Sequence, residues 1–168
     1  FGKTDQIVGG SATYVAYAAS HLTKPVMQIS IVGNDFPVEE MKELEKRGVQ
    51  LTGVEIVKDK KSFFWSGKYH LDMNTRDTLI TDLNVLADFD PKVPEEYQGS
   101  EFLMLGNLMP SLQISVINQL RTRPKLIILD TMNFWMESAL DDLKKVLGMI
   151  DVLMINDSEA RQLSGEFS

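Results

Sequence analysis

The sequence contains no cysteine and only two histidines, His21 and His70, and these shortages exclude several kinds of site. Without cysteine the chain can form neither disulfides nor thiolate metal sites, a composition typical of the reducing cytoplasm. The histidines stand far apart in the chain, and neither has a carboxylate at the spacing of a zinc site. We therefore expect a cytoplasmic protein that is neither a metalloprotease nor a Ser-His-Asp hydrolase.

An excess of positive charge and long apolar runs are also missing. The 168 residues carry a formal net charge of −7, whereas polynucleotides and anionic membranes attract basic surfaces, so we expect neither nucleic acid nor a membrane as a partner. No apolar run approaches the ~20 residues of a membrane helix, and no signal-peptide pattern opens the chain. With 43% hydrophobic residues the chain can bury a core, which predicts one domain or part of one.

Two nucleotide-binding fingerprints are absent as well. The sequence has no phosphate loop ending in Gly-Lys-Ser/Thr and no Gly-x-Gly-x-x-Gly segment. Their absence disfavours a Walker-type NTPase and the usual kind of dinucleotide-dependent dehydrogenase.

What the sequence does contain is an alternation of apolar strand patterns with amphipathic helix patterns. This alternation implies right-handed β-α-β crossovers and therefore an α/β fold, with a doubly wound, Rossmann-like, mostly parallel sheet covered by helices. We predict an α/β core, incomplete at both ends, in residues 1–48 and 89–168. Its predicted strands are 26–32, 101–105, 125–130 and 151–155, and the helices after the first three are 37–47, 110–120 and 136–147.

Residues 49–88 follow a different pattern, which predicts a small antiparallel sheet inserted between the β-α units. An insertion of this kind usually projects as a lid, whose apolar face must be covered by ligand, by the body of the protein or by a second subunit. The aromatic set Phe63, Phe64, Trp65 and Tyr69 could form that face, or could be ordinary hairpin packing. The predicted strands are 53–57, 62–70 and 76–81, joined by polar turns at 58–61 and 72–74.

The double glycine Gly9-Gly10 opens directly into a helix of small residues. Glycine tolerates the unusual dihedrals of a tight entry and has no side chain to block a ligand, and the first amides of a helix are unpaired. This segment, with Tyr14 one turn further on, could therefore hold a polar ligand. The alternative is a plain strand-to-helix turn with Ser11 as the N-cap.

Polar residues follow the predicted strands at their carboxyl ends, where ligands gather in parallel α/β sheets. Asp130 could anchor hydrogen bonds under a site or could merely cap its turn. Asn107 could bind a ligand hydroxyl or could stabilise its own loop. The residues at these ends are Gly33-Asn34-Asp35, Gly106-Asn107, Asp130 and Asn156.

Asn156 and Glu159 combine an amide and a carboxylate after the last predicted strand. Groups of this kind can orient magnesium-bound water near phosphates. The same spacing is close to a capping box, with asparagine at the N-cap and glutamate at N3. Both roles are compatible, since a residue can cap its helix and still present a carboxylate.

In combination these segments resemble those of the ribokinase-like (PfkB-type) family of carbohydrate and nucleoside kinases. The resemblance covers nearly the whole chain and includes the antiparallel insertion in the right place. The matching segments are Gly9-Gly10-Ser11-Ala12, Val32-Gly33-Asn34-Asp35, residues 130–135 and residues 156–160.

The resemblance implies a kinase that passes the γ-phosphoryl group of ATP to a hydroxymethyl group of a sugar or nucleoside. Gly9 and Gly10 would hold substrate hydroxyls, together with Asn107 and the position of Tyr14. Family members commonly carry asparagine where this chain has Tyr14, so the identity of the substrate does not carry over.

The resemblance also implies roles for the lid and the strand ends. Phe64, Trp65 and Tyr69 would belong to the lid, which in family members often also forms a homodimer contact. Asn156 and Glu159 would organise magnesium and the phosphates without a direct metal ligand in the chain, and Asp35 and Asp130 would support the site.

Two features of the family have no counterpart among these 168 residues. One is the Gly-Ala-Gly-Asp segment that supplies the anion hole and the catalytic base, and the other is the opening strand whose aspartate binds sugar. Phosphoryl transfer depends on positioning and charge stabilisation, so we expect a fragment of the kinase with no catalytic residue and no turnover by itself. The alternative is a non-catalytic small-molecule-binding or dimerisation module of the same fold.

Overall fold

The structure is a computed structural model that describes residues 2–71 and 76–166. The chain divides into two compact units, Phe1–Asp90 and Pro91–Ser168. The predicted turn at residues 72–74 lies outside the described residues. Among the described residues, no helix is long and apolar enough to cross a membrane.

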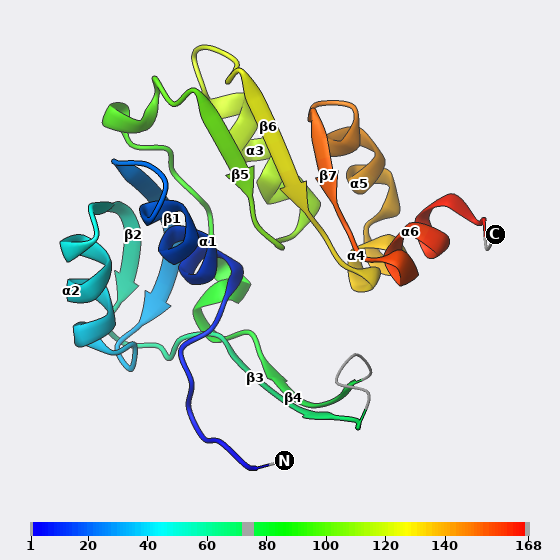
Figure 1. Ribbon diagram of the computed structural model, residues 1–168, viewed down its shortest axis with the longest axis horizontal. Helices are drawn as coiled ribbons and strands as arrows, with labels where there is room; N and C mark the ends of the chain where they lie inside the picture. Colours follow the sequence, from blue (N-terminus) through cyan, green and yellow to red (C-terminus); the bar gives the residue numbers. More distant parts are fainter. Residues whose placement is uncertain (1, 72–75, 167–168) are drawn as a thin grey trace. The chain divides into compact units, whose positions relative to one another are not determined.

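The first unit is built on two parallel strands, β1 (Val26–Gly33) and β2 (Val49–Val57), connected through helix α2 (Val38–Lys46). Helix α1 (Ser11–Ser20) packs against β1, and α2 packs against β2 (Figure 1). Their small core is centred on Ala16, Leu44 and Val49, which are 2–3% exposed. A 3-10 helix, η1 (Asn84–Asp88), also contacts β1.

The segment predicted to be a lid contains an antiparallel hairpin of β3 (Phe64–Tyr69) and β4 (Arg76–Asp82), which extends away from the β1–β2 pair in Figure 1. The prediction that residues 53–57 belong to the antiparallel sheet is wrong, because these residues continue β2, which pairs in parallel with β1. An isolated strand pattern carries no information about the direction of its partner. The α2 crossover before β2 brings it back parallel to β1.

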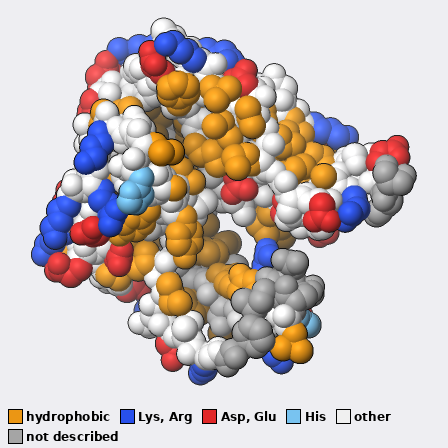
Figure 2. Space-filling view, in the orientation of Figure 1, with side chains coloured by type: hydrophobic (Ala, Val, Ile, Leu, Met, Phe, Trp, Pro, Cys, Tyr) orange, Lys and Arg blue, Asp and Glu red, His pale blue; other side chains and the backbone are white. Residues whose placement is uncertain are grey.

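The second unit is a parallel sheet in the order β5-β6-β7, formed by Phe102–Leu105, Leu126–Asp130 and Val152–Met154. Helices α3 (Pro110–Gln119) and α5 (Leu140–Leu147) pack together on one side of it. Ile127, Leu129 and Leu143 are fully buried in this core. Figure 2 shows apolar side chains gathered over this sheet. Among the residues of its strands, Phe102, Val152 and Met154 are exposed.

The remaining elements of this unit are short. They are the 3-10 helix η2 (Glu95–Tyr97) and helices α4 (Asn133–Ser138) and α6 (Asp157–Ser164). The predicted helix 136–147 is in fact two helices, α4 and α5, which are separated at Ala139. Ser138 does not cap α5, because its hydroxyl donates to the carbonyl of Phe134 at 2.6 Å. The predicted α/β fold with parallel strands and a small antiparallel hairpin is confirmed.

Candidate functional site

In the first unit, helix α1 begins at a glycine that no other residue type could easily replace. Gly10 is the N-cap, with φ 94° and ψ 141°, a region that is almost restricted to glycine. Among the described residues no side chain caps this helix, so the alternative with Ser11 as N-cap is wrong. The first amides of α1 are therefore left for water or for a ligand.

The surroundings of this helix start are open. A Cβ atom built on Gly9 or on Gly10 would meet no described atom within 4 Å. Tyr14 is 60% exposed, and its hydroxyl donates to the carbonyl of Val8 at 3.3 Å. The structure thus brings Gly9, Gly10 and Tyr14 together on one accessible segment. The need for glycine at position 10 comes from the backbone angle rather than from close packing.

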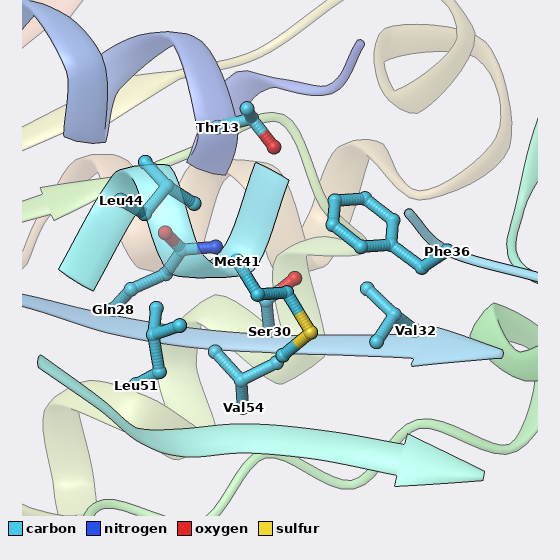
Figure 3. Close-up of a pocket in the computed structure, with 9 residues that line it drawn as sticks. All are labelled: Thr13, Gln28, Ser30, Val32, Phe36, Met41, Leu44, Leu51 and Val54. Carbon is cyan, nitrogen blue, oxygen red and sulfur yellow. The ribbon is translucent and has the colours of Figure 1, made fainter. Parts of the chain in front are cut away.

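A small cavity lies beneath α1, between this helix, α2 and the β1–β2 pair (Figure 3). The polar residues that line it are Thr13, Gln28 and Ser30, and its volume is about 20 Å³. Pockets for drug-sized ligands hold roughly 300–1,000 Å³, so this cavity has room for a water molecule and not for a sugar. It belongs to the packing that supports α1.

The Gly33-Asn34-Asp35 turn forms hydrogen bonds with the segment that leads into β3. The backbone N–H of Ser62 donates to Asp35 Oδ1 at 2.7 Å, the N–H of Gly33 donates to Ser62 Oγ at 2.9 Å, and Asn34 Nδ2 donates to the carbonyl of Lys58 at 2.7 Å. Burial alone raises the pKa of Asp35, but the hydrogen bonds from Ser62 and the charge of Lys61 outweigh it, so this pKa lies below its ordinary value. Asp35 is an anchor for the segment that leads into β3.

The aromatic residues of the lid do not form one face. Trp65 stacks edge-on against Tyr69 with ring centroids 6.4 Å apart, and its indole ring lies over Gly67. Phe64 precedes Trp65 in the strand and therefore points to the opposite face. Every residue of β4 is exposed, so the apolar side chains of the hairpin are accessible on both faces.

The carboxyl ends of the strands in the second unit bring three of the predicted residues together. The backbone N–H groups of Asn107 and Thr131 donate to the Asp130 carboxylate, and Glu159 lies close enough to repel it. Burial and the charge of Glu159 raise the pKa of Asp130 above its ordinary value, although these hydrogen bonds act in the other direction. A carboxylate held under such conditions indicates a site that a cation would stabilise.

Asn156 and Glu159 form a complete capping box at the start of α6. The N–H of Glu159 donates to Asn156 Oδ1 and the N–H of Asn156 donates to Glu159 Oε2, both at 2.9 Å. Glu159 is only 8% exposed, whereas Asn156 is exposed. The capping alternative is therefore realised. One carboxylate oxygen, Oε1, is not engaged in the capping box.

The oxygen donors at this edge suit magnesium chemically, because Mg²⁺ is bound through one or two carboxylates and keeps several waters. Asp130 and Glu159 supply two carboxylates of this kind. Within residues 2–71 and 76–166, no group of three or more histidine, aspartate or glutamate residues could enclose a metal ion.

Two residues at this edge carry contacts that the sequence patterns did not indicate. Trp135 Nε1 donates to Asn107 Oδ1 at 2.8 Å and so fixes the orientation of that amide. Gln113, a residue of α3, donates to the backbone carbonyls of both Gly106 and Asp130. From the sequence, a glutamine in an amphipathic helix is expected at the surface. Only the structure shows that Gln113 is buried, with an exposed fraction of 2%.

The described residues combine parallel α/β units, a helix that begins at Gly10 and an antiparallel hairpin. The family described as pfkB family carbohydrate kinase matches residues 2–168, and the chain belongs to this family. The resemblance found in the sequence is thereby confirmed. The chain is 23% identical over 172 residues to a cytidine kinase of Thermococcus kodakarensis, covering 98% of this chain and 58% of that protein.

Solved structures have the same fold. One is a nucleoside kinase of Burkholderia thailandensis in complex with inosine, with a TM-score of 0.77 and 16% identity, covering 94% of this chain and 52% of that one. Another is an E. coli protein provisionally assigned as ribokinase II, in complex with ATP and Mg²⁺, with a TM-score of 0.70 and 20% identity over 95% and 55% of the two chains. The chain thus spans about half the length of the relatives it matches.

Proposed function

We propose that this chain is the substrate-binding and lid part of an ATP-dependent kinase, which transfers the γ-phosphoryl group to a hydroxymethyl group of a sugar or nucleoside. The observation that carries the proposal is the uncapped start of α1 at Gly10, in a chain that belongs to the pfkB family along residues 2–168. Exposed backbone amides without side chains around them can bind substrate hydroxyls. Tyr14 borders this position and would select among substrates.

The acidic edge of the second unit supports the phosphate side of this proposal. Glu159 and Asp130 would hold a hydrated Mg²⁺ near the phosphates of ATP, and Asn156 would keep Glu159 in place. Asn107 would donate to or accept from a substrate hydroxyl. Bound magnesium neutralises charge on the phosphates, which is its part in phosphoryl transfer. The remaining work of these side chains is positioning. A cytoplasmic location is part of the same proposal.

The 168-residue chain contains no Gly-Ala-Gly-Asp segment, and we propose that it has no turnover by itself. Positioning of substrate without a catalytic base and an anion hole leaves phosphoryl transfer slow. The test incubates a panel of sugars and nucleosides with Mg²⁺ and ATP. It compares this chain with the protein encoded by the complete reading frame that contains it. We expect a phosphorylated product only from the latter. No product from either protein contradicts the kinase proposal, and product from the chain alone contradicts the proposed dependence on that segment.

The role of the glycine pair is tested in the same assay. Gly10→Val places a branched side chain at a positive φ angle, where the strain is on the order of 1–3 kcal/mol, and it covers the first amides of α1. We expect a rise in KM for the acceptor of at least about tenfold, which is a loss of about 1.4 kcal/mol in binding free energy, because the covered amides no longer reach the substrate hydroxyls. Gly99→Ala is the control, because its added methyl group meets no described atom within 4 Å, Gly99 has no positive φ and it lies outside the proposed site. Equal KM values for the two variants contradict this role.

The hairpin favours a second candidate function, a homodimer contact. Its apolar side chains Phe64, Tyr69 and Ile80 are 39%, 50% and 47% exposed. Exposed apolar surface of this kind is typical of an interaction site. We expect a concentration-dependent dimer in sedimentation, which Phe64→Asp dissociates and which Val38→Asp, on an exposed apolar residue of α2, leaves intact. A monomer at all concentrations contradicts the dimer.

A further inference from the structure

The interior of the second unit contains a polar side chain that the proposed function has not used. Gln113 lies in the first part of α3 and is 2% exposed. Its Nε2 group donates to the carbonyl of Gly106 at 2.8 Å and to the carbonyl of Asp130 at 3.2 Å. Its Oε1 atom is buried without a hydrogen-bond partner among the described residues. A buried acceptor without a partner lowers the stability of the folded chain, so stability alone does not explain a glutamine here.

The two carbonyls that Gln113 binds lie directly beyond the last paired residues of β5 and β6, where Asp130 still pairs with Met154 of β7. The last pair in the register of β5 and β6 is Leu105 with Leu129, and Gly106 and Asp130 are the next residues of the two strands. Where a parallel ladder ends, the strand ends are no longer held at the strand spacing by backbone hydrogen bonds. A carboxamide has two N–H donors, and here each meets one strand. Gln113 therefore joins the strand ends at the point where the ladder stops.

Both strands carry a residue of the candidate site at this point. Asn107 follows Gly106, its backbone N–H donates to the Asp130 carboxylate, and its side chain accepts from Trp135. We propose that Gln113 is a positioning residue, which sets the separation between the Asn107 backbone and Asp130 by binding both strand ends. The expected effect of Gln113 on activity rests on the proposed function. Its effect on the spacing of the two strand ends rests on the geometry alone.

The chain offers a matched control on the same helix. Gln119 is also a partly buried glutamine, and its Nε2 donates to the carbonyls of Pro91 and Ser115 at 2.9 and 3.2 Å, at the other end of α3. Replacing either glutamine by methionine keeps the approximate size of the side chain and removes its side-chain hydrogen bonds. For Gln119 these also include a bond to Ser115 Oγ and one accepted from the N–H of Val93. A merely structural role predicts the same behaviour for Gln113→Met and Gln119→Met, namely lower thermal stability with an unchanged site.

The deciding measurement is the indole N–H resonance of Trp135 in the ¹⁵N-labelled 168-residue chain, assigned by its loss in Trp135→Phe. The variant Asn107→Ala gives the position of this resonance when the acceptor is missing. We expect Gln113→Met to move the resonance toward that position and Gln119→Met to leave it in place. An unmoved resonance in Gln113→Met overturns the inference. In the unsubstituted chain the two Nε2 protons of Gln113 should exchange slowly with solvent, and fast exchange overturns the inference even if a variant does not fold.

The same variants in the protein of the complete reading frame give the catalytic consequence. Outer residues that orient the groups of a metal site affect activity by roughly 10–100-fold, so we expect a loss of this size in kcat/KM for Gln113→Met and none for Gln119→Met. An active enzyme in which both variants retain full kcat/KM overturns the positioning role. If the unsubstituted enzyme phosphorylates no substrate, the proposed function fails, and the indole resonance still decides whether Gln113 positions the strand ends.

Discussion

The carboxyl end of β1 and the carboxyl end of β5 are similar in sequence and different in structure. Each strand is followed by Gly-Asn, as Gly33-Asn34 and as Gly106-Asn107. In the first unit the turn is committed to the base of the lid, where Asp35 accepts from Ser62 and a Cβ on Gly33 would lie 2.3 Å from the backbone of Lys61. In the second unit Asp130, at the end of the neighbouring strand β6, is instead half-buried beside the like charge of Glu159.

The two aspartates show what this difference means. Hydrogen bonds from Ser62 hold the pKa of Asp35 below its ordinary value, against the effect of burial. Burial and Glu159 raise the pKa of Asp130. A carboxylate that its neighbours stabilise contributes to the fold. A carboxylate that is destabilised in the folded state is a candidate for a functional role. The first strand end is therefore built to hold the lid, and the second is the better candidate for chemistry.

The largest expected effect concerns the end of β1, where Gly33 is tightly packed. Gly33→Ala drives a methyl group into backbone atoms of residues 60–62, which cannot move aside as a flexible side chain would. We expect a loss of about 2–3 kcal/mol in the free energy of unfolding, at the upper end of overpacking effects. Denaturant titration measures it, with Gly99→Ala as the control because its methyl group meets no described atom within 4 Å. Similar values for the two variants contradict the tight turn.

A smaller effect distinguishes the two roles of Glu159 at the start of α6, which are capping the helix and carrying a negative charge. Glu159→Ala removes the acceptor for the N–H of Asn156, and we expect a loss of about 1 kcal/mol in stability. Glu159→Gln keeps an oxygen acceptor and should lose only a few tenths of a kcal/mol, from the weaker interaction with the helix dipole. In the protein of the complete reading frame, both variants should lower the affinity for Mg²⁺, so that a higher Mg²⁺ concentration is needed for half-maximal activity. Full magnesium affinity in Glu159→Gln would show that only the cap matters.

The smallest expected effect concerns Asp130 and has the opposite sign. Because its folded-state pKa lies above the ordinary value of 3.8, the folded chain binds more protons than the unfolded chain between the two values. Stability therefore falls as the pH rises through this window, and the penalty is fully present above it. Asp130→Asn keeps an acceptor for Asn107 and removes the charge, so we expect a gain of about 0.5–1 kcal/mol at neutral pH.

The pH dependence of unfolding checks this prediction. Asp35 has a lowered pKa, so its stabilisation is present above 3.8 and is lost as the pH falls through the folded-state value. The difference in unfolding free energy between Asp130→Asn and the unsubstituted chain isolates the contribution of Asp130 from that of Asp35. This difference should shrink on acidification. A constant difference, or a less stable variant at neutral pH, would contradict a penalty at Asp130.

Much of the fold follows from local sequence patterns. The apolar run within 125–130 predicted β6 because a buried parallel strand needs nearly continuous apolar residues. The Asn156-x-x-Glu159 spacing predicted its capping box because both partners lie within one turn of the same helix. Gly9-Gly10 predicted an open helix start for the same reason, since the N-cap angle is a local property.

Only the tertiary structure decided which distant segments meet. Residues 53–57 were assigned to the lid from their pattern, but the crossover through α2 pairs them with β1. The roles of Asp35 and Asp130 differ because of Ser62 and Glu159, each more than 25 residues away in the chain. In the sequence Gln113 is an ordinary helix residue. Only the fold brings its carboxamide to the carbonyls of Gly106 and Asp130 at the ends of β5 and β6. Sequence patterns thus determined the elements, because their causes are local, while burial and hydrogen bonding between elements determined which polar residues form a site.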